Sequence, residues 1–132
     1  MPEHKLMGGY SRSLDRYYDL YVAVEPDGRV CLREAYEYPD RPGIEGREYG
    51  YRLWIAAAQV DAWLACLARE AQVEPAVAPA GKETHLVMVL ERLIEQGKLA
   101  PPETARAKEN LDTFISWLEQ EHIPYETSSW VW

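Results

Sequence analysis

The residues best suited to chemistry in this sequence are three histidines, two cysteines and many carboxylates, and their spacing matches no catalytic motif. The most suggestive pair is Glu119 and His122, one helical turn apart, as in carboxylate-bridged di-iron bundles. Such sites need two of these pairs and two further glutamates from neighbouring helices, whereas here one pair falls at a predicted helix end. The favoured interpretation is that His122 complements the negative end of that helix. We therefore expect no metal and no cofactor.

Signatures of nucleotide binding and nucleophilic catalysis are missing as well. The glycines of residues 7–10 lack the lysine and hydroxyl that a phosphate loop carries at fixed offsets, and no Gly-x-Ser-x-Gly elbow occurs. Cys31 and Cys66 have no adjacent histidine and lie in apolar segments, so we expect small buried side chains and a reducing, cytoplasmic setting. An enzyme with a dispersed site stays an alternative. Its best candidates are His85, His122, Glu34, Glu37 and Glu48.

Tyrosines and carboxylates interleave at residues 34–40 and 45–51. The chain has nine Tyr, five Trp and one Phe, although Tyr and Trp carry a polar atom that needs a partner when buried. Two interpretations stay open: a half-buried sheet whose tyrosine hydroxyls reach solvent, or an acidic, aromatic surface that binds a protein. The second assigns these residues to the binding surface: Glu34, Tyr36, Glu37, Tyr38, Asp40, Glu45, Glu48, Glu126, Trp130 and Trp132.

Length and charge narrow the class of protein. The chain has 132 residues, 47% of them apolar, which is enough for one domain with an ordinary core. The longest apolar run, residues 53–58, is too short to cross a membrane, and the first residues do not resemble a secretory signal. The net charge of −8 argues against nucleic-acid binding and suits either a soluble protein or one that meets a basic partner.

Period-two alternation, as in Leu20, Val22 and Val24, predicts strands joined by turns rich in proline and glycine. The predicted strands lie at about residues 19–25, 30–38 and 47–55, with turns at 26–29 and 39–43. A β-branched and aromatic segment at 125–132 predicts a fourth strand, and residues 1–9 are expected to form a loose tail.

Apolar residues three and four apart predict three helices between the third and fourth strands. Their stripes are Val60, Trp63, Leu64, Leu67 and Ala71, then Leu86, Val89, Leu90, Leu93 and Ile94, and finally Leu111, Phe114, Ile115 and Leu118. A linker is expected at 74–81, and the prolines at 101 and 102 are expected to open the third helix.

This order of elements predicts a single α+β domain over residues 1–132: a small antiparallel sheet, made of a three-strand meander and a C-terminal strand, packed against three helices. The C-terminal strand fits an edge or a central position. The expected core is Leu20, Val22, Val24, Leu53, Ile55, Trp63, Leu64, Leu67, Leu86, Leu90, Leu93, Leu111, Ile115 and Leu118.

The sequence resembles bacterial immunity proteins, the cytoplasmic antidotes of polymorphic or contact-dependent toxins. The resemblance covers about residues 18–72. It lies in a hairpin at 24–30 and in Tyr51-Arg52-Leu53-Trp54-Ile55 leading into an Ala/Leu/Trp-rich helix, within a small acidic domain. It implies a role rather than individual residues: to bind a cognate toxin domain, one with a basic cleft, and to occlude its active site. A phage-type inhibitor or nucleic-acid mimic acting on a host protein, and a small enzyme, are the alternatives.

Overall fold

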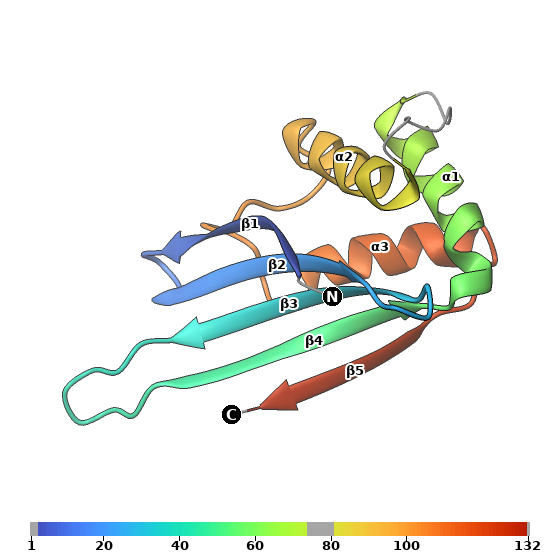
Figure 1. Cartoon of the computed structure of the whole chain (residues 1–132). Helices are drawn as coiled ribbons and strands as arrows, with labels where there is room; N and C mark the ends of the chain where they lie inside the picture. The colour runs from blue at the N-terminus through green and yellow to red at the C-terminus, as the bar shows by residue number, and fades with distance from the viewer. Residues whose placement is uncertain (1–2, 74–80, 132) are drawn as a thin grey trace.

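The computed structural model describes residues 3–73 and 81–131 and contains a five-stranded antiparallel sheet with three helices on one face (Figure 1). The predicted α+β class is confirmed. The strands are β1 (His4–Ser11), β2 (Arg16–Val24), β3 (Val30–Tyr38), β4 (Arg47–Ile55) and β5 (Glu126–Val131). The helices are the short 3₁₀ turn η1 (Ala57–Gln59), α1 (Val60–Ala71), α2 (Lys82–Glu95) and α3 (Glu109–Gln120).

The sheet is a simple meander in which each strand pairs with the next, in the order β1-β2-β3-β4-β5. The C-terminal strand therefore takes an edge position beside β4. The predicted strands at 30–38 and 47–55 match β3 and β4. On β4 the residues Tyr49, Tyr51, Leu53 and Ile55 share the inward face, whereas Glu34 interrupts the apolar residues on the inward face of β3.

The expectation of a loose tail and of four strands is wrong, because residues 4–11 form β1 along the outer side of β2. The adjacent glycines Gly8 and Gly9 masked this strand in the sequence. Gly9 lies in the sheet where Pro102 packs closely, with 3.2 Å between the proline Cβ and the place where a Gly9 Cβ would stand. Glycine therefore marks a close approach here, and it does not mark disorder.

The core fills the space between the sheet and the helices. Eleven of the predicted core residues are buried, whereas Val24, Leu64 and Ile115 are partly buried at its margin. Both cysteines are buried and free, as expected. Most of the predicted linker at 74–81 lies outside the described residues. No helix of the described part is long and apolar enough to cross a membrane.

The third helix begins later than predicted, at Glu109 instead of near Pro101. Residues 101–104 form a turn in which Ala105 N donates to Pro101 O, 2.9 Å away. Lys108 then adopts a left-handed backbone (φ 66°) and donates its N–H to the Tyr36 hydroxyl at 2.8 Å. This tertiary bond places the helix start at a point that local sequence preference does not identify.

The face of the sheet away from the helices, here called the open face, is covered by its own side chains. Stacked aromatic and arginine groups do this: the Arg33 guanidinium lies 4.3 Å from the centre of the Tyr21 ring, and that of Arg52 lies 5.5 Å from Trp130. Trp130 in turn lies on Gly50 of β4, where a Cβ atom would come within 2.6 Å of its ring. Cation–π stacking thus shields this face in place of a helix layer.

Candidate partner-binding surface

Two turns meet at one end of the sheet, which we call the hairpin end. It comprises residues 12–17, which form the β1–β2 turn and the start of β2, and residues 37–48, which form the β3–β4 loop and the strand ends beside it. In Figure 1 the β3–β4 loop extends beyond the layer of helices. Arg41 joins the two turns through an ion pair with Asp15, with 2.6 Å between Nη2 and Oδ1. The Tyr10 hydroxyl donates to the same carboxylate. The loop is therefore held against the neighbouring turn.

The loop is also ordered internally. Arg41 and Ile44 exchange two backbone hydrogen bonds of 3.0 and 2.8 Å, and Gly46 N donates to Asp40 Oδ1 at 2.5 Å. A side chain at Gly46 would collide with the backbone of Tyr38 and Asp40, at 2.6 and 2.9 Å. The loop thus presents its side chains from a defined backbone, which reduces the entropy lost on binding.

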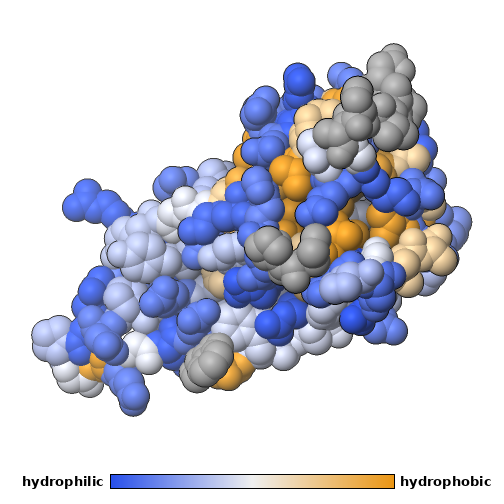
Figure 2. All heavy atoms as spheres, viewed as in Figure 1, coloured by the Kyte–Doolittle hydropathy of each residue, from blue (hydrophilic) through white to orange (hydrophobic). Residues whose placement is uncertain are grey.

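Four carboxylates gather at the hairpin end, in a hollow that one arginine, Arg47, also lines. Glu37, Asp40, Glu45 and Glu48 line a shallow hollow of about 360 Å³, and in residues 3–73 and 81–131 none of them forms an ion pair. Arg47 lines the same hollow without forming an ion pair there, and its guanidinium lies 5.5 Å from the centre of the Tyr38 ring. Arg12 is exposed in the other turn. Figure 2 shows this projecting end, at its lower left, as mostly hydrophilic.

Exposed apolar groups gather at the same end. Four large apolar side chains are exposed in the described part of the chain, and three of them are Leu14 (37%), Tyr17 (45%) and Ile44 (66%). Tyr17 stacks on Tyr10 with 5.0 Å between ring centres, and it lies opposite Glu37 in the sheet. Exposed apolar area beside free carboxylates is typical of a surface that another protein covers.

Two residues assigned to the binding surface are not on the surface at all. Glu34 and Tyr36 are fully buried on the helix side of β3, which corrects that assignment. They continue the inward alternation of Val30 and Leu32, so the period of the strand overrides their polarity.

Glu34 belongs to a buried network instead. Tyr18 donates its hydroxyl to Glu34 Oε2 at 2.5 Å, and Asn110 Nδ2 donates to the Tyr18 oxygen at 3.0 Å. Burial raises the pKa of Glu34 to about 7, and burial together with the neighbouring carboxylate raises the pKa of Tyr18. The hydroxyls of Tyr18 and Tyr36 thus have partners inside the protein, which neither interpretation of the sequence included.

Little in the amino-acid sequence indicates this network. Asn110 is a polar residue in the apolar stripe of α3, and its side chain also bridges Ala100 N and O, at 2.7 and 3.0 Å. Arg16 is also buried, with its guanidinium 4.7 Å from the centre of the Tyr36 ring, and it donates to the carbonyl of Ala105. A polar residue within an apolar stripe was the one signal that could have pointed to such a buried site.

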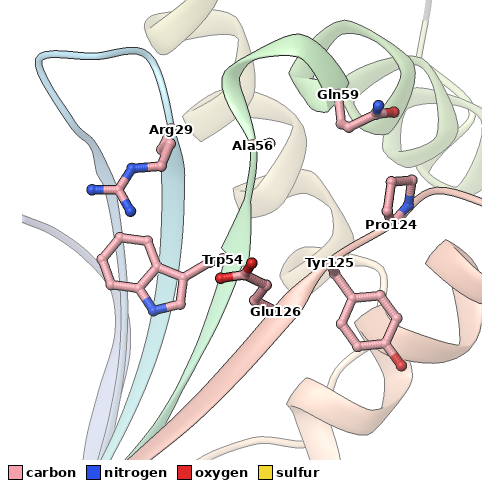
Figure 3. Close-up of a pocket in the computed structure, with 7 residues that line it drawn as sticks. All are labelled: Arg29, Trp54, Ala56, Gln59, Pro124, Tyr125 and Glu126. Atoms are coloured by element: carbon pink, nitrogen blue, oxygen red, sulfur yellow. The ribbon is translucent and has the colours of Figure 1, made fainter.

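The C-terminal residues of the predicted surface lie elsewhere, on β5. Glu126 is exposed at the end of the sheet opposite the hairpin end, and Trp130 is half-buried on the open face. Trp132 lies outside the described residues. Glu126 lines a hollow of about 340 Å³ together with Arg29 and Trp54 (Figure 3). The Arg29 guanidinium lies 4.9 Å from the centre of the Trp54 ring. Of the ten predicted residues, the structure brings together Glu37, Tyr38, Asp40, Glu45 and Glu48.

The residues considered for a dispersed enzyme site are spread over separate parts of the fold. His85 is buried in α2, His122 is exposed after α3, and the Glu34 carboxylate lies on the opposite face of β3 from that of Glu37. Neither histidine lines the hollow at the hairpin end. In the described part of the chain, no three His, Cys, Asp or Glu side chains are grouped so that they could hold a metal ion.

The chain matches no protein-family model, no curated protein and no solved structure.

Proposed function

We propose that this protein is a non-catalytic binding protein that uses its hairpin end to engage a protein with a basic surface. One observation carries the proposal: carboxylates without ion pairs in the described residues and exposed apolar side chains occur together at the hairpin end, where Glu37 lies opposite both Tyr17 and Glu48 in the sheet and Ile44 is exposed in the adjoining loop. Carboxylates there would attract Arg and Lys side chains and speed association, and the apolar groups would slow dissociation.

The role we propose is that of an immunity protein, which binds a cognate toxin in the cytoplasm and covers its active site. Two features support it besides the resemblance in residues 18–72. The net charge of −8 suits a toxin with a basic cleft, and the β3–β4 loop projects far enough from the helices to enter such a cleft (Figure 1).

The experiment is co-expression of this protein with the toxin encoded by the neighbouring gene. Charge reversal of Glu37→Lys together with Glu48→Lys should abolish both protection of the cell and co-purification of the toxin. Asp40 is left unchanged because its carboxylate holds Gly46 in the loop. The matched control reverses Glu91 and Glu95, two exposed carboxylates of α2.

The control should protect as well as the unmodified protein. If the Glu37/Glu48 variant folds and still protects, the hairpin end is not the binding surface. If the chain is inert toward the toxin but transforms a small molecule, the proposed class of protein is wrong.

A further inference from the structure

The two edges of the sheet differ in how they resist pairing with another strand. At one edge, β1 carries a bulge between Lys5 and Met7, a lysine and two adjacent glycines, and α2 contacts it. Bulges, lysines and covering helices are the usual devices that keep an edge strand from pairing. The β1 edge is therefore protected.

The other edge, β5, lacks these devices. Its six residues, Glu126–Val131, pair with β4 in unbroken register and include no proline, lysine or arginine. Every residue except Trp130 is exposed, and Val131 reaches 78%. In Figure 1 no described element lies beside the outer side of β5. Its outward backbone N–H and C=O groups are therefore free to pair with another strand.

We propose that β5 pairs antiparallel with β5 of a second copy, so that two sheets join into one continuous sheet of ten strands. The protected β1 edge argues for this closed arrangement, since pairing of β5 with β1 of the next copy would build an open filament. With a two-fold axis at β5, the free edges of both copies pair with each other, and the outer edges of the joined sheet are the two protected β1 strands.

The charges on β5 fit an antiparallel pair. Glu126 begins the strand and Trp130 lies near its end, beside Arg52. In the described residues neither Glu126 nor Arg52 forms an ion pair within its own copy. Antiparallel pairing brings Glu126 of each copy alongside the Trp130 end of the other, and both groups lie on the open face. The pair thus places opposite charges near each other.

The same symmetry keeps the remaining negative charge apart. The hairpin end lies beyond the Val131 end of β5, so antiparallel pairing points the two hairpin ends in opposite directions. A chain with net charge −8 would otherwise resist association with its own copy. Both hairpin ends stay free in this dimer, and the dimer would therefore bind two partner molecules.

Sedimentation velocity over a range of protein concentrations tests the dimer, with Ser129→Lys as the main variant. In the register that sets Glu126 beside Trp130, the two-fold axis passes through Ser128. Ser129 is exposed next to it, so the two lysines would lie diagonally across the axis from each other. The control is Ser116→Lys, which adds the same charge on the exposed face of α3. The dissociation constant of the dimer should rise by about tenfold or more for Ser129→Lys and stay unchanged for Ser116→Lys.

Mixing provides a second test that does not depend on loss of function. Equal amounts of Ser129→Lys and Ser129→Glu should restore dimers that neither variant forms well alone, because the unlike charges then meet across the axis. Circular dichroism would first establish that each variant is folded. A monomer at about 100 µM, near the weak end of specific affinities, would overturn the proposal. Equal dissociation constants for the Ser129→Lys dimer and the Ser116→Lys dimer would also overturn it.

Discussion

Glu37 of β3 and Glu48 of β4 lie directly opposite each other on the open face of the sheet, and neither has a cationic partner in the described part of the chain. Like charges placed opposite each other destabilise a strand pair. The repulsion between Glu37 and Glu48 therefore lowers the stability of the folded protein. A basic partner would offset this loss by neutralising both carboxylates.

The first prediction concerns this pair. Glu37→Gln should raise the free energy of unfolding by about 0.5 kcal/mol, because one of two facing charges is removed. The measurement is urea denaturation at low ionic strength, where surface charges are least screened. Glu91→Gln, on the exposed face of α2, is the control and should change stability less. A loss of stability in Glu37→Gln would show that the carboxylate makes a favourable interaction within the protein.

The second prediction concerns pH. The pKa of Glu34 is raised by burial to about 7 from an ordinary value of 4.5, so the folded state holds this proton more tightly than the unfolded state. The stability that protonated Glu34 contributes is complete below about pH 4.5 and is lost as the pH rises through 7. The shift corresponds to a loss of about 3 kcal/mol.

Glu34→Gln isolates this contribution, because glutamine keeps an acceptor for the Tyr18 hydroxyl and carries no charge. Urea denaturation at pH 5 and pH 8 should show a smaller fall in stability for Glu34→Gln than for the unmodified protein. The variant should be the more stable of the two at pH 8. Identical pH profiles for the two proteins would contradict this account of the buried network.

The third prediction concerns Gly50. Gly50→Ala should lower the free energy of unfolding by roughly 1–3 kcal/mol, the usual cost of inserting a group into filled space. The added methyl group would meet the Glu34 carbonyl oxygen and the Trp130 ring. Ser128→Ala, on the same face of the adjacent strand, is the control and should change stability little. Equal stability of Gly50→Ala and Ser128→Ala would mean that Trp130 does not rest on this glycine.

The fourth prediction compares two leucines of the helices. Leu90→Ala should lower the free energy of unfolding by about 2–5 kcal/mol, because the Leu90 side chain on α2 is fully buried in the core. Leu64→Ala should cost about half of that or less, since Leu64 is partly exposed and leaves a smaller cavity. Thermal or chemical denaturation measures both. A larger loss for Leu64 would place the buried stripe of α1 on the wrong face.

The sequence was most informative where a single period runs without interruption. On β4, Leu53 and Ile55 placed the strand with correct bounds, whereas the alternation on β3 is less regular and its bounds came from the turns at 26–29 and 39–43. The sequence was misleading where tertiary contacts determine whether a segment forms a strand. Gly8 and Gly9 hid β1, because the close packing of Pro102 that favours glycine there is not visible in the chain.

The candidate surface was predicted only in part, for a related reason. Glu48 and the loop carboxylates follow from the alternation of β4, which points Glu48 away from the core side, and from the loop composition. Glu34 was assigned to the surface because it is charged, although the alternation with Leu32 points it inward. Its partners Tyr18 and Asn110 come from β2 and α3, and only the folded chain brings them together. A buried carboxylate is exceptional enough that polarity outweighed periodicity in the prediction.

The most direct measurement of the central claim is the binding of the proposed partner, a toxin sought in the neighbouring gene, to the Glu37→Gln/Glu48→Gln variant at two ionic strengths. At low salt we predict a dissociation constant higher by about tenfold or more, mainly through slower association, because each exposed charge pair contributes up to about 1 kcal/mol. The difference should shrink at high salt, and Glu91→Gln/Glu95→Gln should bind like the unmodified protein. Equal binding by both double variants at low salt would contradict the assignment of the hairpin end as the partner-binding surface.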